Sequence, residues 1–82
     1  MYDLIYTEKV KKQLKSLDKN LSFRIVESLE RCKVRPHSYV KKLQGNPYFR
    51  LRVGDYRIIL DIKDNELIIL VLELGHRKHI YD

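Results

Sequence analysis

The sequence predicts an α+β domain in which a short N-terminal strand and two helices precede a three-stranded antiparallel sheet. Apolar residues recur at intervals of three and four through the first half of the chain, which is the spacing of an amphipathic helix. In the second half they alternate with polar residues, which is the spacing of a strand. The 82 residues contain no repeat, low-complexity tract or Gly/Ser linker. We therefore expect one domain, residues 1–82, with the helices packed on one face of a twisted sheet.

The first half contains the signals of one strand and two capped helices. Residues 2–6 alternate as a short strand does. Thr7 followed by Glu8 has the pattern of a helix N-cap and an acidic first turn, and Asp18 can cap a second helix, which ends before Pro36. The apolar stripes are Val10, Leu14 and Leu17 in the first helix, and Leu21, Ile25, Leu29 and Cys32 in the second. Two helices joined this tightly form an antiparallel hairpin.

The second half predicts a meander of three antiparallel strands. Its strands are residues 49–53, 56–63 and 66–74. Gly54-Asp55 has the Gly-X pattern of a two-residue primed turn, and Asp64-Asn65 is expected to be the second tight turn. One face then carries the predicted core, which the helices would cover: Leu51, Val53, Ile58, Leu60, Ile62, Leu67, Ile69 and Val71.

Arginines gather on the opposite face of the predicted sheet. Arg50 and Arg52 alternate along one strand, and a two-residue loop would put Arg52 directly opposite Arg57. Like charges directly opposite one another weaken a sheet, so local folding gives no reason for this pair. A bound polyanion would, because the guanidinium fork matches two phosphate oxygens. Taken singly, each arginine is better explained as a solvated or ion-paired residue, with Asp55, Asp61 or Glu73 as its partner.

The same face carries an apolar group that no third helix can cover. This group is Ile59, Ile68, Leu70 and Leu72. An open apolar patch beside arginines suits an amphipathic segment of a partner protein, whose acidic residues would neutralise the arginines. The alternative is that the patch packs on loops near the first strand or on a second copy of the chain.

The end of the chain adds further cationic and aromatic residues. Strict alternation puts Arg77 on the core face, so it joins the other arginines only if Gly75 marks a bulge or the strand end turns. Tyr81 could stack on an unpaired base or bond to a ribose hydroxyl, although most residues this close to a terminus simply fray. His76 and His79 are weak metal candidates, and a surface role is the more ordinary one for both.

Composition narrows the partner and the compartment. Seventeen Lys and Arg against eleven Asp and Glu give a net charge of +6, which favours nucleic acid, anionic lipid or an acidic protein as partner. Lys41 and Lys42 fit phosphate contacts or simple solubility. The single cysteine allows no intramolecular disulfide. No apolar run approaches the roughly 20 residues of a membrane span, and the N-terminus lacks the layout of a secretory signal, so we expect a cytoplasmic protein with no membrane contact.

Two motifs resemble a known family. They are Tyr-Phe-Arg-Leu-Arg-Val-Gly-Asp-Tyr-Arg-Ile-Ile at 48–59 and Leu-Glu-Leu-Gly-His-Arg-Lys-His-Ile-Tyr at 72–81. With the expected order of elements, the chain resembles the RelE/ParE superfamily of toxin–antitoxin toxins, and is most similar to its RelE branch. The resemblance implies a monomeric cytoplasmic endoribonuclease that enters the ribosomal A site, cuts messenger RNA without metal or cofactor, and is held inactive in a complex with its cognate antitoxin.

The resemblance also implies roles for individual residues in an attack by a ribose 2′-hydroxyl on the adjacent phosphate. Arg57 matches the arginine that stabilises the transition state, Arg77 the one near the leaving group, and Tyr81 the tyrosine that stacks on or orients the substrate. Arg50 stands where RelE proteins often have a catalytic lysine, and an arginine is a poor general base. The base is therefore unassigned, with Tyr81 and His79 as candidates. Further RNA contacts are expected from Arg52, Lys41, Lys42, Lys78 and His79.

Two other functions stay open at this point. The ParE branch shares the scaffold but inhibits gyrase without cutting RNA, so the arginines could contact a target enzyme. A non-catalytic RNA-binding module fits the charge alone, although the sequence has no ladder of stacking residues.

Overall fold

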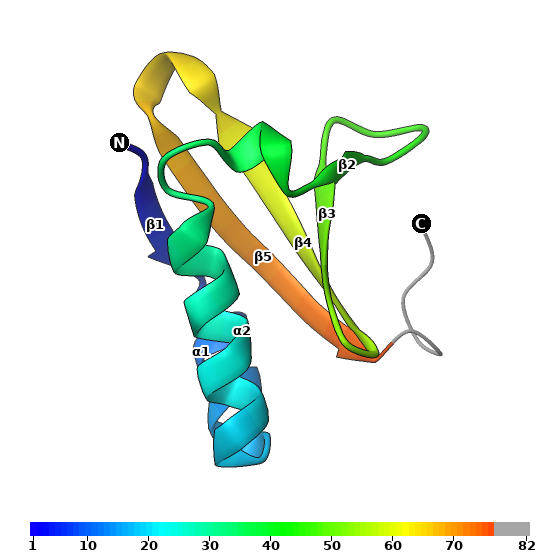
Figure 1. Ribbon diagram of the computed structural model, residues 1–82. Coiled ribbons are helices and arrows are strands. Elements are labelled where there is room, and N and C mark those ends of the chain that lie inside the picture. The colour runs from blue at the N-terminus through cyan, green and yellow to red at the C-terminus, as the bar shows by residue number, and fades with distance from the viewer. Residues whose placement is uncertain (77–82) are drawn as a thin grey trace.

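The structure of the protein is a computed structural model, and it describes residues 1–76 (Figure 1). In chain order its elements are β1 (Asp3–Tyr6), α1 (Glu8–Ser16), α2 (Lys19–Arg31), β2 (Lys41–Lys42), β3 (Phe49–Val53), β4 (Tyr56–Lys63) and β5 (Ile68–His76). The predicted order of a strand, two helices and an antiparallel meander is confirmed, and the fold is α+β.

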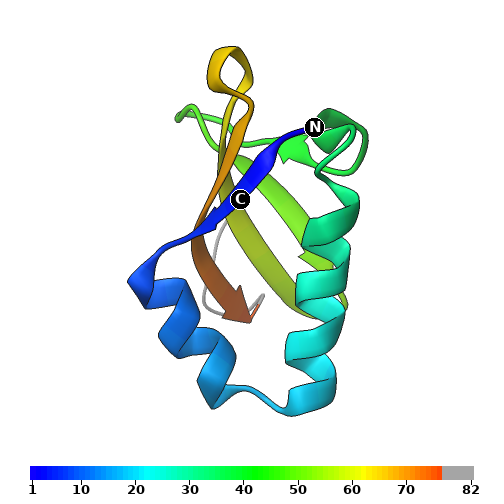
Figure 2. The same cartoon turned by 90° about the vertical axis from the view of Figure 1, so that its left-hand side faces the viewer.

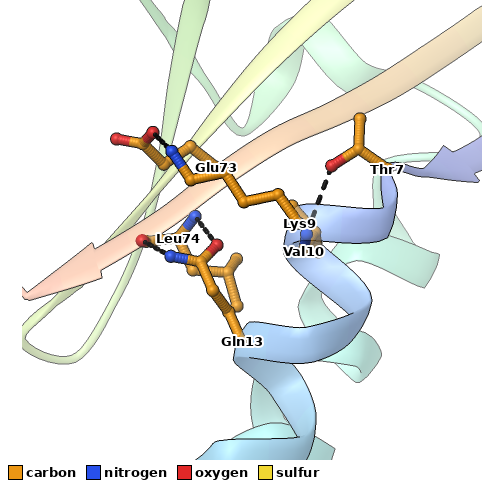
Figure 3. A network of polar contacts seen from close by, with 6 residues as sticks. All are labelled: Thr7, Lys9, Val10, Gln13, Glu73 and Leu74. Carbon is orange, nitrogen blue, oxygen red and sulfur yellow. Dashed lines mark hydrogen bonds and ion pairs between the residues drawn. The ribbon is translucent and has the colours of Figure 1, made fainter.

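Both helices begin at the predicted caps. The Thr7 hydroxyl accepts a hydrogen bond from the Val10 N–H at 3.2 Å (Figure 3), and the Asp18 carboxylate accepts from two N–H groups in the first turn of α2. Such caps satisfy donors that have no partner within the helix. α1 and α2 run in opposite senses on one side of the sheet, joined by a tight connection (Figure 2). Val10, Ile25 and Leu29 of the helices are buried in the core, together with Cys32 at the C-cap of α2.

The sheet has five strands in the order β1-β5-β4-β3-β2. β1 pairs with β5 in parallel, while the other neighbours are antiparallel. β2 was not predicted, because two residues give no periodicity to detect. The parallel pairing of β1 joins strands that are more than sixty residues apart in the chain (Figure 1), and local patterns carry no information about it.

The hairpin between β3 and β4 has the predicted two-residue loop. Val53 pairs with Tyr56 across Gly54-Asp55, and Gly54 adopts a φ of +59°. A glycine at the first loop position is what a type II′ turn requires, because a side chain there would be strained. This turn sets the register of the whole hairpin.

The loop between β4 and β5 corrects one prediction. The expected two-residue turn at Asp64-Asn65 is replaced by a 3₁₀ turn over Asp64–Glu66, followed by Leu67 in the left-handed region at φ 55°. Leu67 is 47% exposed, so its predicted place in the core is wrong. The longer loop shifts the pairing between β4 and β5 by two residues. Because side chains alternate between the two faces of a strand, an even shift leaves each β5 residue up to Val71 on its predicted face.

A β-bulge interrupts β5 where the sequence predicted strict alternation. Ile59 pairs with Glu73 but Leu60 pairs with Val71, which leaves Leu72 as the extra residue. The faces of β5 exchange beyond this point. Leu74 therefore enters the core, where it is 3% exposed.

The core lies between the helices and the sheet, and seven of its eight predicted strand residues are buried: Leu51, Val53, Ile58, Leu60, Ile62, Ile69 and Val71. Residues of both helices and of β1 complete it. In the part of the chain described here, neither helix is long and apolar enough to cross a membrane. The opposite face of the sheet carries the candidate site.

Candidate functional site

Three arginines share the sheet face that the helices leave open. Arg50 and Arg52 project from β3 and Arg57 from β4, because their neighbours Leu51 and Ile58 point into the core. Arg52 lies directly opposite Arg57 in the ladder, as predicted. We call the surface formed by Arg50, Arg52 and Arg57 the arginine face.

The positive charges of the arginine face act on one another. The pKa of Arg50 is lowered, first by burial and then by the charges of Arg57 and Arg52. The Nε atom of Arg57 is itself buried. Both burial and nearby like charge disfavour a cation, which accounts for the lowered pKa of Arg50.

Two of the three carboxylates that the sequence offered as partners for the arginines are engaged by lysines. Asp61 forms an ion pair with Lys63 at 3.3 Å, and Glu73 forms one with Lys9 (Figure 3). Lys9 belongs to α1, so its ion pair also ties that helix to the second half of β5.

The two lysines of β2 lie on different faces. Lys41 pairs with Arg50 and so belongs to the arginine face, whereas Lys42 pairs with Phe49. The Lys42 Nζ atom lies 5.7 Å from the centroid of the Phe49 ring and donates to backbone carbonyls, that of Leu43 among them. The structure therefore brings Lys41 to the arginines but not Lys42, although both were predicted to contact RNA.

Four of the predicted site residues lie outside the described part of the chain: Arg77, Lys78, His79 and Tyr81. Arg77 was expected to join the other arginines only if Gly75 marked a bulge or the strand end turned. A bulge does occur in β5 before Arg77. The bulge is at Leu72 rather than at Gly75, and it places Gly75 opposite Arg57 on the arginine face. His76 pairs with Tyr56 on the helix side, with ring centroids 5.6 Å apart at an angle of 82°.

The predicted apolar patch is present as partly buried side chains: Ile59, Ile68, Leu70 and Leu72. The structure adds Ile5, which pairs with Leu70 and is 44% exposed. The sequence showed Ile5 on a short strand but could not place that strand beside β5. We call these five side chains the apolar strip.

Gln13 of α1 completes the edge of β5 where β1 ends (Figure 3). Its Nε2 donates to the Leu74 carbonyl at 2.8 Å, and the Leu74 N–H donates to its Oε1 at 3.0 Å. Gln13 was not among the predicted site residues, since a glutamine on a helix carries no signal of such a contact in the sequence. A pocket of about 290 Å³ adjoins it, lined by Gln13, Ser16, Leu17, Tyr56, Leu74, Gly75 and His76.

A second polar cluster lies away from the arginine face. The Tyr2 hydroxyl donates to Asp64 Oδ1 at 2.7 Å, and His37 Nε2 lies 2.9 Å from the same oxygen. The hydrogen bonds from Tyr2 and then from His37 lower the pKa of Asp64. Within residues 1–76, no group of three or more His, Cys, Asp or Glu side chains is placed to hold a metal ion.

Comparison with known proteins identifies the class to which this fold and face belong, namely toxins of type II toxin–antitoxin systems. A family model described as the ParE toxin of the type II system parDE matches residues 4–81. An Escherichia coli protein described as a RelE-like toxin is 30% identical over 80 residues, which cover 94% of this chain and 84% of that protein. The chain belongs to the RelE/ParE superfamily and is a RelE-like toxin.

Solved structures agree with this assignment. The toxin–antitoxin complex RelBE2 from Mycobacterium tuberculosis matches with a TM-score of 0.84 and 24% identity, over 93% of this chain and 98% of that one. The archaeal RelE–RelB complex from Pyrococcus horikoshii OT3 matches with a TM-score of 0.82 and 29% identity, over 96% and 98%. The first likeness concerns the fold alone, and the second accompanies a similarity in sequence as well.

Proposed function

We propose that this toxin is a ribosome-dependent endoribonuclease that cuts messenger RNA in the A site and thereby inhibits translation. The observation that carries the proposal is the direct opposition of Arg52 and Arg57, with Arg50 close enough for their charges to lower its pKa. A sheet gains nothing from such an arrangement. A phosphodiester held between the guanidinium groups offsets the repulsion and receives several hydrogen bonds at once.

The chemistry is attack of a ribose 2′-hydroxyl on the adjacent phosphate, which yields a cyclic phosphate and a free 5′-hydroxyl without a metal. Arg57 is assigned, on the resemblance, to meet the charge that develops on the phosphorane. Arg50 and Arg52 position the phosphate. Arg77 is assigned to the leaving group and Tyr81 to the neighbouring base, on the resemblance alone.

Substrate affinity rests on a wider set of cations around the reacting phosphate. Lys41 extends the arginine face across β2. Lys78 and His79 are proposed to contact the RNA backbone on the resemblance alone. Since the Lys42 ammonium group lies beside Phe49 on the other side of the sheet, a contact between Lys42 and RNA would need a second surface.

The proposed partner is a cognate antitoxin that binds the toxin monomer in the cytoplasm and blocks the arginine face. The solved neighbours include RelB–RelE complexes from several organisms. On this chain the apolar strip lies beside the arginines on the same sheet, and Ile5 makes it continuous across β1 and β5. An antitoxin segment with one apolar and one acidic side fits both surfaces.

The test is inducible expression followed by mapping of messenger 5′ ends. We expect new ends within translated codons for the wild-type chain and none for Arg57→Ala. Arg31→Ala is the matched control, because Arg31 is an exposed arginine at the end of α2 that pairs with Glu27 at 3.7 Å and is not part of the arginine face. Cuts that persist at full frequency in Arg57→Ala would contradict the proposed catalytic role of Arg57.

A second candidate is inhibition of gyrase without RNA cleavage. It is favoured by one specific observation, the match of the ParE family model to residues 4–81. Growth arrest with intact messages and damaged chromosomes would support this candidate. Loss of toxicity in Arg57→Ala would not separate the two functions, so the 5′-end map decides between them.

A further inference from the structure

Within the described residues 1–76, the arginine face itself consists of guanidinium groups, which accept a proton poorly. Attack by a 2′-hydroxyl requires that its proton be taken away as the bond to phosphorus forms. An arginine has a very high pKa, so it stays protonated and serves poorly as a general base. The carboxylates of Asp61 and Glu73, on the same side of the sheet, form ion pairs with Lys63 and Lys9.

The short strand β2 places an amine beside the arginines. Lys41 pairs with Arg50 in an antiparallel ladder, where opposed residues share a face with their Cα atoms about 4.5–5.5 Å apart. Leu43, the residue after β2, helps to hold the pairing of β2 with β3 in place. Leu43 is 7% exposed, and its N–H donates to the Tyr48 carbonyl at 3.0 Å. The backbone of β2 is thus fixed, while the Lys41 side chain is exposed and able to reach a ligand.

Lysine differs from arginine in its lower pKa, which is the property that a general base on the arginine face needs. Its ordinary pKa is about 10.4, and its four-carbon stem lets one nitrogen approach a hydroxyl as either donor or acceptor, according to its protonation state. The three guanidinium groups can bind the phosphate oxygens through their fixed forks. Lys41 lies at the flank of that cluster, on the far side of Arg50 from Arg57.

We propose that Lys41 is the general base of the cleavage reaction, which rests on the nuclease function proposed above. The unprotonated Nζ atom takes the 2′-hydroxyl proton as the 2′-oxygen forms its bond to phosphorus. The bond from phosphorus to the 5′-oxygen breaks, and that oxygen takes a proton from water. The ammonium group then returns its proton to water, so that protons balance over the cycle.

The first test compares Lys41→Arg with the wild type in single-turnover cleavage of messenger RNA on programmed ribosomes, from pH 6 to pH 9. The variant keeps the charge but loses the base. We expect the rate to fall by about 100-fold or more, with loss of the rise with pH. Lys63→Arg is the control, because Lys63 is an exposed lysine on the same side of the sheet, paired with Asp61. An unchanged rate, or a slow rate with the wild-type rise, overturns the proposal.

The second test restores an amine chemically. Lys41→Cys is treated with 2-bromoethylamine, which rebuilds a lysine-like side chain with a less basic amine. The other cysteine, Cys32, is buried, and burial raises the pKa of its thiol to about 11, so alkylation is directed to position 41. Restored cleavage with the pH profile moved to lower pH supports the proposal, and a failure to restore cleavage by the folded, alkylated protein overturns it.

A third measurement separates a base from an acid. A substrate with sulfur at the 5′-bridging position needs no proton to release its leaving group. If this substrate rescues Lys41→Arg, the lysine acts as the acid and the assignment is wrong; continued slow cleavage supports the base. Should the wild-type chain cut no message at all, the proposed nuclease function fails instead, an outcome distinct from every result with the variants.

Discussion

Gln13 offers Leu74 both of the hydrogen bonds that a neighbouring strand would provide (Figure 3). β1 pairs with β5 only as far as Val71, and the glutamine amide satisfies the edge beyond the bulge. Gly75 follows and lies opposite Arg57. A side chain of α1 therefore holds the last part of β5 in the register of the arginine face.

Replacing Gln13 by alanine should destabilise the protein. The change leaves the part-buried N–H and carbonyl of Leu74 without the glutamine, and we expect the free energy of unfolding to fall by about 1–3 kcal/mol in urea denaturation. Gln13→Glu keeps an acceptor for the N–H but turns a carboxylate oxygen toward the carbonyl, so it should be no better. Gln44→Ala, at an exposed turn position, is the control and should stay within about 0.5 kcal/mol. A neutral Gln13→Ala would mean that water satisfies this edge equally well.

Arg52 should be a residue whose removal stabilises the fold and weakens the function. It is exposed and lies opposite Arg57, so Arg52→Thr removes a repulsive pair and adds a β-branched residue to a strand. We expect a gain of about 0.2–1 kcal/mol in the free energy of unfolding at low salt. Binding to single-stranded RNA, measured by fluorescence anisotropy, should weaken.

Salt provides the control for Arg52→Thr. Added salt screens exposed charges over about 10 Å at 0.1 M, so the stability difference between variant and wild type should shrink as salt rises. A variant that is less stable than the wild type at low salt would show that Arg52 is held by attractive contacts that outweigh its repulsion with Arg57.

The parts of the fold that the sequence predicts are those set by neighbours in the chain. Thr7 and Asp18 cap helices through groups two or three residues away, and the turn at Gly54 fixes the opposition of Arg52 and Arg57 within six residues. The central pair of the site therefore follows from local rules alone.

The parts that could not be predicted depend on contacts distant in sequence. β1 lies beside β5 because a short apolar strand completes the sheet edge, and no local pattern names its neighbour. The bulge at Leu72 lets Leu74 enter the core while Gln13 satisfies its backbone. Lys41 joins the site only through a two-residue strand, so from the sequence it could not be told apart from Lys42.

Stability should depend on Asp64 in acidic solution, as the pH falls below the ordinary pKa of 3.8. Its pKa is lowered from the ordinary 3.8 by hydrogen bonds from Tyr2 and then His37. A carboxylate with a lowered folded pKa contributes stability that is complete above the unfolded pKa and is lost as the pH falls through the folded value. We expect the wild type to lose more stability than Tyr2→Phe between pH 6 and pH 3, measured by urea denaturation at each pH. Parallel curves would show that the Tyr2 hydrogen bond does not survive in solution.

Cys32 should be inert in the folded toxin. The side chain is 0% exposed, and burial raises the pKa of its thiol to about 11, although the charge of Arg31 opposes the rise. The thiolate is the reactive form, so iodoacetamide at pH 8 should label the native protein very slowly and the urea-unfolded protein quickly. Labelling at the same rate in both states would place the thiol outside the core.

At position 67, a glycine variant should be more stable than an alanine variant. Its φ of 55° is left-handed, a conformation that costs an L-residue about 1–2 kcal/mol and costs glycine little. Leu67→Ala removes the half-exposed side chain but keeps the strain, whereas Leu67→Gly removes both. In regular structure glycine is the less stable of the two by about 0.5–1 kcal/mol, so here the order should reverse. If Leu67→Gly unfolds at lower urea than Leu67→Ala, then Leu67 does not adopt the left-handed conformation in solution, and the 3₁₀ turn does not form as described.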